Sequence, residues 1–319
     1  MSPVVRVVAR PEGDRRTPPV PWRVRLRLDE LVLAARLAGD VPLPLRLDGS
    51  GAVDRVSDRL AGTPLSVARA QVASAVARAD DPGPGGARSS LGDRGLLAGD
   101  DVEPALATAL GVLAGGPLGA VLDVSATRRA GTSRLRSWFG AAPGLVAQLS
   151  TGDGLEHELA WFDPALWASQ VTRAATVEPW VAGSAPLALP DHVSLPSDLL
   201  AGSAKAYREG RADLVPVMAA THAGRVRLGE AGAVREADSG EAVAVLETLG
   251  TACRGRLRLV TLRRDRAERP AVTAWLLFDD GWHELRPGRD ATSVLRRRET
   301  GDLGLLTWPI VAAATGEAS

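Results

Sequence analysis

A chain of 319 residues with 45% hydrophobic and 24% charged residues can bury a large core, and its composition is that of a globular protein. Acidic and basic residues balance at 38 each, which excludes the strong positive field that drives nonspecific binding to phosphate backbones. No apolar run approaches the roughly 20 residues that cross a bilayer. The single cysteine, Cys253, excludes an internal disulfide framework and a cysteine-based metal cluster.

The amino-terminal residues 1–21 are rich in Pro and Arg and lack any periodicity, which predicts a disordered tail. They show no secretory signal, so we expect a cytoplasmic protein without membrane insertion. The fold is expected to begin at Trp22, where apolar residues alternate with arginines in a strand. Asp29 is then expected to cap a helix that ends at Gly39.

The middle of the chain alternates between helices and strands. A helical pattern over 64–80 ends at the Pro- and Gly-rich stretch "DPGPGG", and a second helix follows with Asp101 near its start and Gly115 near its end. Short strands separated by turn residues come next, over 118–126, 133–139, 144–150 and 155–162.

The second part of the chain repeats this order of elements. A helix over 163–175 and a Pro-rich loop lead to a short strand and a helix over 192–210. Further elements are helices over 214–224 and 239–250, a strand hairpin over 255–285 and a helix near 290–299.

Two short segments carry the clearest local trace of duplication. Five residues of "TGDGLEHELAWF" match five of "FDDGWHELRPG", including both "HEL" triplets at His157 and His283. We therefore predict an α+β, pseudo-twofold duplicated fold with a central antiparallel β-sheet flanked by helices. It is expected to form a single domain over 22–315, built of two similar halves of about 22–185 and 186–315.

The "HEL" triplets suggest a metal or acid–base site, but strand geometry weakens this reading. Neighbouring residues of a strand point to opposite faces, so His157 and Glu158 cannot converge on one ion, and we predict structural, solvent-facing roles for both triplets. No nucleophile elbow, phosphate loop or dinucleotide fingerprint occurs. We therefore predict a protein that is not an enzyme and that has no cofactor, metal or catalytic residue.

An arginine-rich hairpin over 254–269 leaves an alternative open. Arg256 and Arg258 alternate with Leu257 and Leu259, as in a strand with one buried and one solvated face. The same arginines would suit a nucleic-acid-associated regulatory protein, although readers of single strands add exposed aromatic side chains to such a groove.

Three segments resemble the EspG family of actinobacterial type VII (ESX) secretion-associated proteins: "RGLLAGDDVEPALATALGVLAGGPLGAVLDV", "HELAWFDPALWASQV" leading to "VSLPSDLL", and "GRLRLVTLRRDRAERPAVTAWLLFDDGWHEL". The resemblance covers roughly residues 22–300 in the order of elements. It implies an EspG-like fold and a cytosolic chaperone without enzymatic activity. The implied partner is a PE-PPE-like pair or another helical-hairpin ESX substrate, which the chaperone would keep soluble for export.

A chaperone of this kind needs an apolar surface patch with a polar rim. The candidate partner-binding residues are Leu214, Val217 and Met218, which have helical spacing, and Trp180 in the Pro-rich loop between the halves. The alternative for the first three is a role in the core.

Overall fold

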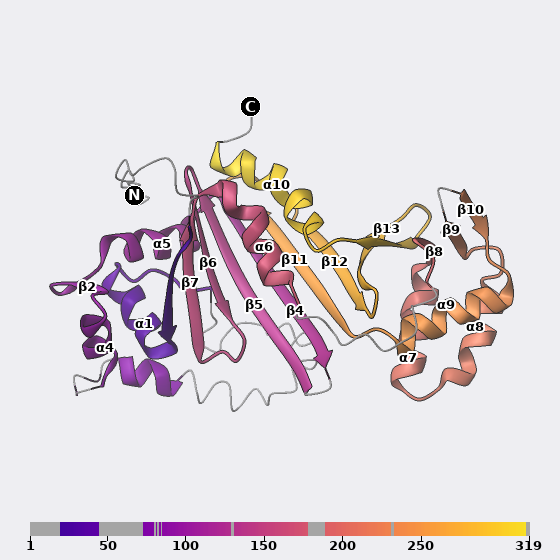
Figure 1. Cartoon of the computed structure of the whole chain (residues 1–319), viewed down its shortest axis with the longest axis horizontal. Coiled ribbons are helices and arrows are strands. Elements are labelled where there is room, and N and C mark those ends of the chain that lie inside the picture. Colours follow the sequence, from indigo (N-terminus) through magenta and orange to yellow (C-terminus); the bar gives the residue numbers. More distant parts are fainter. Residues whose placement is uncertain are drawn as a thin grey trace.

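The computed structural model describes residues 20–44, 73–79, 81, 83, 85–128, 131–177, 189–230 and 233–316. Over these residues a 12-stranded antiparallel sheet runs through the molecule and helices pack against it (Figure 1). The predicted α+β class with a central antiparallel sheet is confirmed. Most of the predicted tail, the first part of the helix expected over 64–80 and Trp180 lie outside the described residues.

The first half contains the four strands that the sequence predicts after the glycine-rich stretch. Its elements in chain order are β1 (Trp22–Arg27), α1 (Leu28–Leu37), a helical segment over 73–79, α4 (Ala87–Asp93), β2 (Leu97–Ala98), β3 (Asp101–Val102), α5 (Pro104–Gly115), β4 (Leu118–Arg128), β5 (Gly131–Ala142), β6 (Leu145–Thr151), β7 (Glu156–Phe162), η1 (Pro164–Leu166) and α6 (Trp167–Ala175).

The second half repeats much of this order. Its elements are β8 (His192–Pro196), α7 (Ser197–Arg208), η2 (Ala212–Leu214), α8 (Val215–Thr221), β9 (Arg227–Glu230), β10 (Ala233–Glu236), α9 (Ser239–Thr251), β11 (Gly255–Arg263), β12 (Ala271–Phe278), β13 (Gly281–Pro287), β14 (Thr292–Arg298) and α10 (Asp302–Thr315). None of the described helices is long and apolar enough to span a bilayer.

The strand order shows the pseudo-twofold relation directly. Read outward from the central pair β4–β11, the sheet runs β4-β5-β6-β7-β1 on one side and β11-β12-β13-β14-β8 on the other, followed by β9 and β10. An equivalent backbone hydrogen bond joins β1 to β7 in the first half and β8 to β14 in the second. Leu28, just after β1, donates its N–H to the carbonyl of Leu155, just before β7, at 2.9 Å; Ser197, just after β8, donates to Ala291, just before β14, at 2.9 Å. Thus β1 corresponds to β8 and β7 to β14, whereas the domain boundaries near residue 185 stay a prediction.

The two "HEL" triplets are not equivalent in this arrangement. His157 lies on β7 and His283 lies on β13, but β7 corresponds to β14 and β13 to β6. The prediction of a duplicated fold is therefore correct, while the local match on which it rested aligns strands that the topology does not relate. A shared turn followed by a strand start explains the similarity of the two segments.

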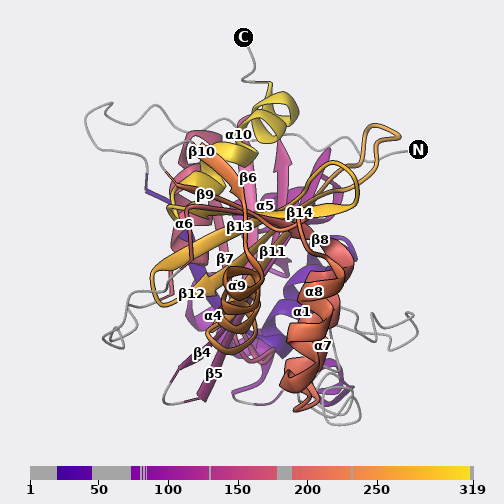
Figure 2. The same cartoon turned by 90° about the vertical axis from the view of Figure 1, so that its right-hand side faces the viewer.

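Three hydrophobic clusters hold the helices on the sheet. On one face, α6 and α10 cover the centre, and Trp167 on α6 donates its indole N–H to Thr307 on α10 at 2.9 Å. On the opposite face, α1 and α5 cover the β1 end, and α7, α8 and α9 cover the β8 end (Figures 1 and 2). The centre of this second face, around β4 and β11, therefore lies between two groups of helices.

Glycine permits the close approach of α5 to the sheet. A Cβ on Gly140 of β5 would lie 2.1 Å from the carbonyl oxygen of Val112, so only glycine fits beneath this helix. The helix begins at Pro104, and the Glu103 carboxylate accepts hydrogen bonds from the N–H groups of Ala105 and Leu106 at 3.0 and 2.8 Å.

Two sequence-based predictions of local structure are wrong. The segment near 290–299 is a strand, β14, because its alternating Ser293 and Leu295 are buried against the sheet; the helix α10 begins only at Asp302. Asp29 does not cap α1 but lies inside its first turn. The carboxylate of Glu30 instead accepts the backbone N–H of Arg27, the residue that precedes the helix, at 2.8 Å.

Candidate partner-binding surface

The centre of the second face, which no described helix covers, carries an apolar patch that we call the sheet patch. It consists of Val121 on β4, Val260 and Leu262 on β11, and Val272 on β12. Val260 lies opposite both Val121 and Val272 in the ladder, so these side chains share one face. Val272 is 53% exposed and Leu262 is 39% exposed. An apolar surface between two helical groups is suited to contact another protein.

Charged side chains line one side of the sheet patch. Arg256 and Arg258 are exposed on the same face of β11, as the alternating sequence predicts, while Leu257 and Leu259 are buried beneath α6 and α10. Arg258 lies opposite Asp123 of β4, whose carboxylate accepts a hydrogen bond from Arg136 of β5. The surface thus has an apolar centre and a polar rim, the usual anatomy of a protein interface.

Several arginines of the hairpin over 254–269 are engaged within the chain. Arg263 donates two hydrogen bonds to Asp265, at 2.8 and 2.6 Å. Arg264 lies over Gly119 and donates to the carbonyl oxygens of Ala114 and Gly116, where it caps the carboxyl end of α5. Burial lowers the pKa of Arg264.

The aromatic side chains near this hairpin are not available for stacking on bases. Trp275, Phe278 and Trp282 are all buried, the first and third in the cluster beneath α6 and α10. Single-stranded nucleic acids are held largely by exposed aromatic platforms. These three side chains therefore offer no stacking surface for the nucleic-acid alternative.

The sequence-predicted residues of the second half lie on the helical group that flanks the sheet patch. Leu214 ends η2 and is 39% exposed, and Val217 on α8 is 65% exposed. Met218 is half-buried, and its methyl group packs so closely on α7 that a Cβ on Gly202 would lie 2.3 Å from it. Figure 2 views this helical group from its outer side. The fourth predicted residue, Trp180, lies outside the described part of the chain.

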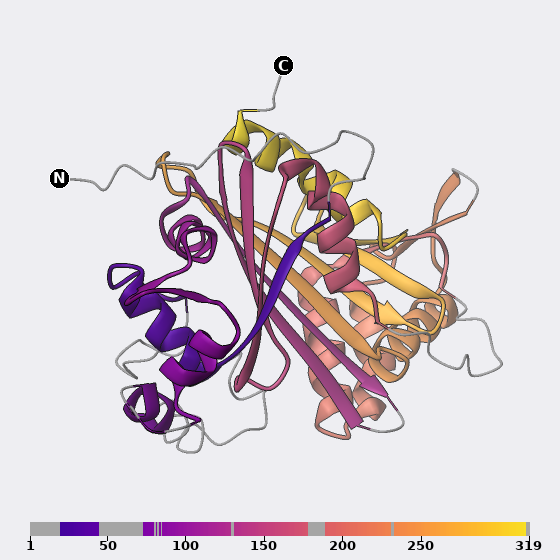
Figure 3. The ribbon, with the colours of Figure 1, turned by 60° about the vertical axis from the view of Figure 1, so that its left-hand side comes forward.

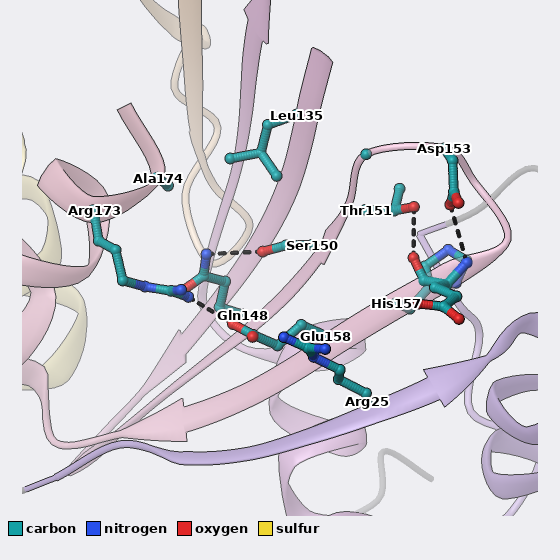
Figure 4. A pocket seen from close by; sticks show the side chains of 12 residues that line it. Arg25, Leu135, Gln148, Ser150, Thr151, Asp153, His157, Glu158, Arg173 and Ala174 are labelled. Atoms are coloured by element: carbon teal, nitrogen blue, oxygen red, sulfur yellow. Dashed lines mark hydrogen bonds and ion pairs between the residues drawn. The ribbon is translucent and has the colours of Figure 1, made fainter. Parts of the chain in front are cut away.

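A polar groove lies at the other end of the sheet, on the face that carries α6 (Figure 4). It has a volume of about 370 Å³, and Arg25, Gln148, Glu158 and Arg173 are among its lining residues. Glu158 accepts hydrogen bonds from Arg23 at 2.5 Å and Arg173 at 2.6 Å. Burial alone would raise the pKa of Glu158, but these two arginines hold it below its ordinary value of 4.5.

His157 and Glu158 both line the groove but do not form an acid–base pair. His157 leaves β7 on the face opposite to Glu158, since successive residues of a strand alternate. Burial lowers the pKa of His157 to about 4, and neither ring nitrogen has a hydrogen-bond partner among the described residues. Asp153 raises the pKa of His157, but burial outweighs this effect, so a neutral imidazole and a carboxylate held by two arginines are poorly arranged for proton transfer.

The prediction that the "HEL" triplets face solvent is wrong. His157 is 1% exposed, and His283 and Glu284 are also buried. His283 Nε2 lies 3.1 Å from both carboxylate oxygens of Asp280, and Glu284 accepts hydrogen bonds from Arg286 and Arg298. No group of three or more His, Cys, Asp or Glu within the described ranges has the geometry to hold a metal ion.

Sequence reasoning missed the sheet patch. Its residues come from β4 and from the β11–β12 hairpin far later in the chain, and each taken alone is an ordinary alternating position. The only available signal was the mixture of Arg256 and Arg258 with Val260 and Leu262 on one face of a single strand, which departs from a purely polar outer face.

Comparison with known proteins gives a match in structure alone. No protein-family model matches the chain, and no curated protein matches its sequence. The solved structure of the Mycobacterium tuberculosis type VII secretion system chaperone EspG5 in complex with a PE25-PPE41 dimer is similar, with a TM-score of 0.53 and 13% identity. The match covers 92% of this chain and 96% of that chain. The EspG-like fold that the sequence resemblance implies is thereby confirmed.

Proposed function

We propose that this chain, which has the fold of a type VII secretion chaperone, is a cytoplasmic, non-enzymatic chaperone for a PE-PPE-like helical protein pair. The observation that carries the proposal is the fold similarity to EspG5, which extends over nearly the whole of both chains and was found for a complex with a PE25-PPE41 dimer. In this role the chain binds its partner before export and keeps it soluble.

The sheet patch has the chemistry that this role needs. A helical partner with an exposed apolar tip self-associates unless another surface covers the tip. Leu262, Val260 and Val272 offer the apolar contact, and Arg256 and Arg258 beside them would orient a tip with acidic flanks. A stable complex buries roughly 800 Å² on each partner, which is more than four side chains supply.

We therefore extend the proposed surface to the neighbouring helical group. Leu214 and Val217 supply exposed apolar side chains there, and Met218 fixes α8 against α7 while remaining partly accessible. A flexible thioether at the border of core and surface suits adaptable contacts with a helix. Trp180 is proposed as an additional anchor on sequence grounds.

Co-expression with the small helical secretion proteins encoded nearby tests the proposal. We expect a soluble complex of defined stoichiometry, measured by size-exclusion chromatography with light scattering. Val217→Asp and Leu262→Asp should each weaken the complex, because each places a charge in the buried centre of an interface. Leu305→Asp is the matched control, since Leu305 is 66% exposed on α10, on the opposite face of the sheet.

Two outcomes would overturn the proposal. One is the absence of binding to any of these helical proteins when both components are folded. The other is a complex that forms equally well with all three aspartate variants, which would separate binding from the proposed surface.

A further inference from the structure

The strand β1 has a free edge, whereas its pseudo-twofold counterpart β8 pairs with a further strand. In the second half, β8 pairs with β14 on one side and with β9 on the other, where His192 lies opposite Gly229 and Ser194 opposite Arg227. In the first half, the corresponding strand β1 pairs with β7 and ends the sheet. Figure 3 turns this edge forward, with β1 in indigo between α1 and α6.

The correspondence can be read residue by residue from the shared hydrogen bond. Because Leu28 corresponds to Ser197, Arg23 corresponds to His192, Val24 to Val193 and Arg25 to Ser194. Val24 and Val193 both face the apolar clusters beneath their respective helices. The three residues of β8 that pair with β9 therefore correspond to residues 23–25 of β1.

The outer edge of β1 is closed from the carbonyl of Arg25 onward and open before it. The N–H of Arg27 donates to Glu30, and the carbonyl of Arg25 accepts a hydrogen bond from the Arg94 guanidinium. Among the described residues, no hydrogen bond reaches the N–H or C=O of Arg23 or the N–H of Arg25. Two donors and one acceptor thus point outward, in the alternating pattern that pairs with another strand.

The side chains along this run indicate what kind of strand it accepts. Arg25 lines the polar groove, and its exposed guanidinium has no partner among the described residues. Arg23 lies on the same face, and its guanidinium donates hydrogen bonds to Glu158 and Gln170, so the free positive charge of this run is that of Arg25. Between the two arginines, Val24 faces the apolar side of the sheet, as Val193 does opposite Leu228 of β9.

We propose that residues 23–25 of β1 bind an extended segment of a partner protein by strand addition, with an acidic residue opposite Arg25 and an apolar residue opposite Val24. Backbone hydrogen bonds supply the affinity, and the acidic and apolar side chains supply the selectivity. This edge is distinct from the sheet patch, so the proposal stands independently of the proposed chaperone function.

Other occupants fit this edge less well. A second copy of the chain would place β1 against β1, which brings arginines directly opposite arginines on one face. The phosphates of a nucleic acid would satisfy the charge, but they only accept hydrogen bonds and cannot donate to the carbonyl of Arg23 as the N–H of a paired strand does.

The probe is a fluorescein-labelled short peptide with blocked ends and the sequence Ser-Thr-Glu-Leu-Glu-Thr-Ser, titrated with the full chain and followed by fluorescence anisotropy. We expect saturable binding. Replacing both Glu by Lys should abolish it, and methylating the backbone nitrogen of the residue that pairs with Arg23 should weaken it by about tenfold at unchanged charge.

Two variants of the protein separate the backbone from the side chains. Arg23→Pro removes the outward N–H at a position where an edge strand tolerates proline, and it should bind about tenfold more weakly than Arg23→Ala, which loses the same side chain. Arg25→Glu should also lower affinity by about tenfold or more through repulsion of the acidic probe. Circular dichroism and thermal unfolding establish that each variant is folded.

Several results would overturn the proposal. They are an absence of peptide binding, equal affinities of Arg23→Pro and Arg23→Ala, and equal binding of the methylated peptide. Displacement of the peptide by a single-stranded oligonucleotide, with a steep salt dependence, would identify a general anion surface. A dimer that Arg23→Pro converts to a monomer, measured by light scattering, would identify a second copy as the occupant.

Discussion

His157 offers a sharp test of the described packing, because it is a buried ionisable group with no hydrogen-bond partner among the described residues. The perturbation is His157→Leu, which keeps a similar volume on the face of β7 that packs beneath α1 and α5 and removes both ring nitrogens. Since an unsatisfied buried polar atom costs free energy, the variant should be at least as stable as the wild-type protein at neutral pH.

The size of the effect follows from the pKa of His157, which burial lowers from 6.5 to about 4 in the folded chain. Between these values the unfolded chain binds a proton at this site and the folded chain does not. Stability therefore falls as the pH falls from 6.5 towards 4, and levels off below. From pH 7 to pH 5, this single group should lower the free energy of unfolding by about 2 kcal/mol.

The assay is urea unfolding of both proteins, followed by tryptophan fluorescence at several pH values between 4 and 7. The difference between wild type and variant isolates His157, because the other titrating groups are common to both. We expect this difference to grow in favour of the variant by about 2 kcal/mol between pH 7 and pH 5. A difference that stays constant over this range, or that grows in favour of the wild type, would refute the reasoning.

Three further predictions concern the interface and the packing of the first half. Leu262→Asp should weaken the partner complex by about 2 kcal/mol or more, with Leu305→Asp unchanged, measured by titration calorimetry on the purified components. Gly140→Ala should destabilise the chain by more than about 2 kcal/mol, because its Cβ would lie 2.1 Å from a backbone oxygen of α5. Gly111→Ala, on that helix, has free space around its Cβ and should stabilise the chain by about 0.5 kcal/mol. Thermal unfolding of the two variants distinguishes these effects. Glu30→Gln should cost about 1–3 kcal/mol in urea unfolding, because this buried carboxylate accepts hydrogen bonds from three groups; no loss would contradict its role.

Local patterns predicted most of the strands because each carries its own alternation and turn residues. The strand pairs β4–β5 and β6–β7 follow this rule, and so does β11 with its alternating arginines and leucines. The segment of β14 is predicted as a helix from the sequence, but it is a strand because it pairs with β8, which lies far earlier in the chain.

Leu214 and Val217, on the adjacent elements η2 and α8, are exposed as a surface role requires, and their part in binding stays a prediction. The sheet patch needs the register of three strands, which no local signal supplies. The burial of His157 was likewise hidden from the sequence. A histidine beside acidic residues at a turn is predicted to be exposed, because the sequence does not show which helices cover that face of the strand.

The pairing of β4 with β11 also bears on how the chain is made. When the ribosome has produced residues 1–175, every strand of the first half is present, and β1 can already close against β7. The edge of β4 that faces away from β5 stays unpaired until its partner β11, Gly255–Arg263, has been synthesised. During that interval β4, a long strand rich in apolar residues, has unpaired backbone groups along one edge. The strand at the pseudo-twofold axis is therefore exposed to aggregation with neighbouring chains until the second half is made.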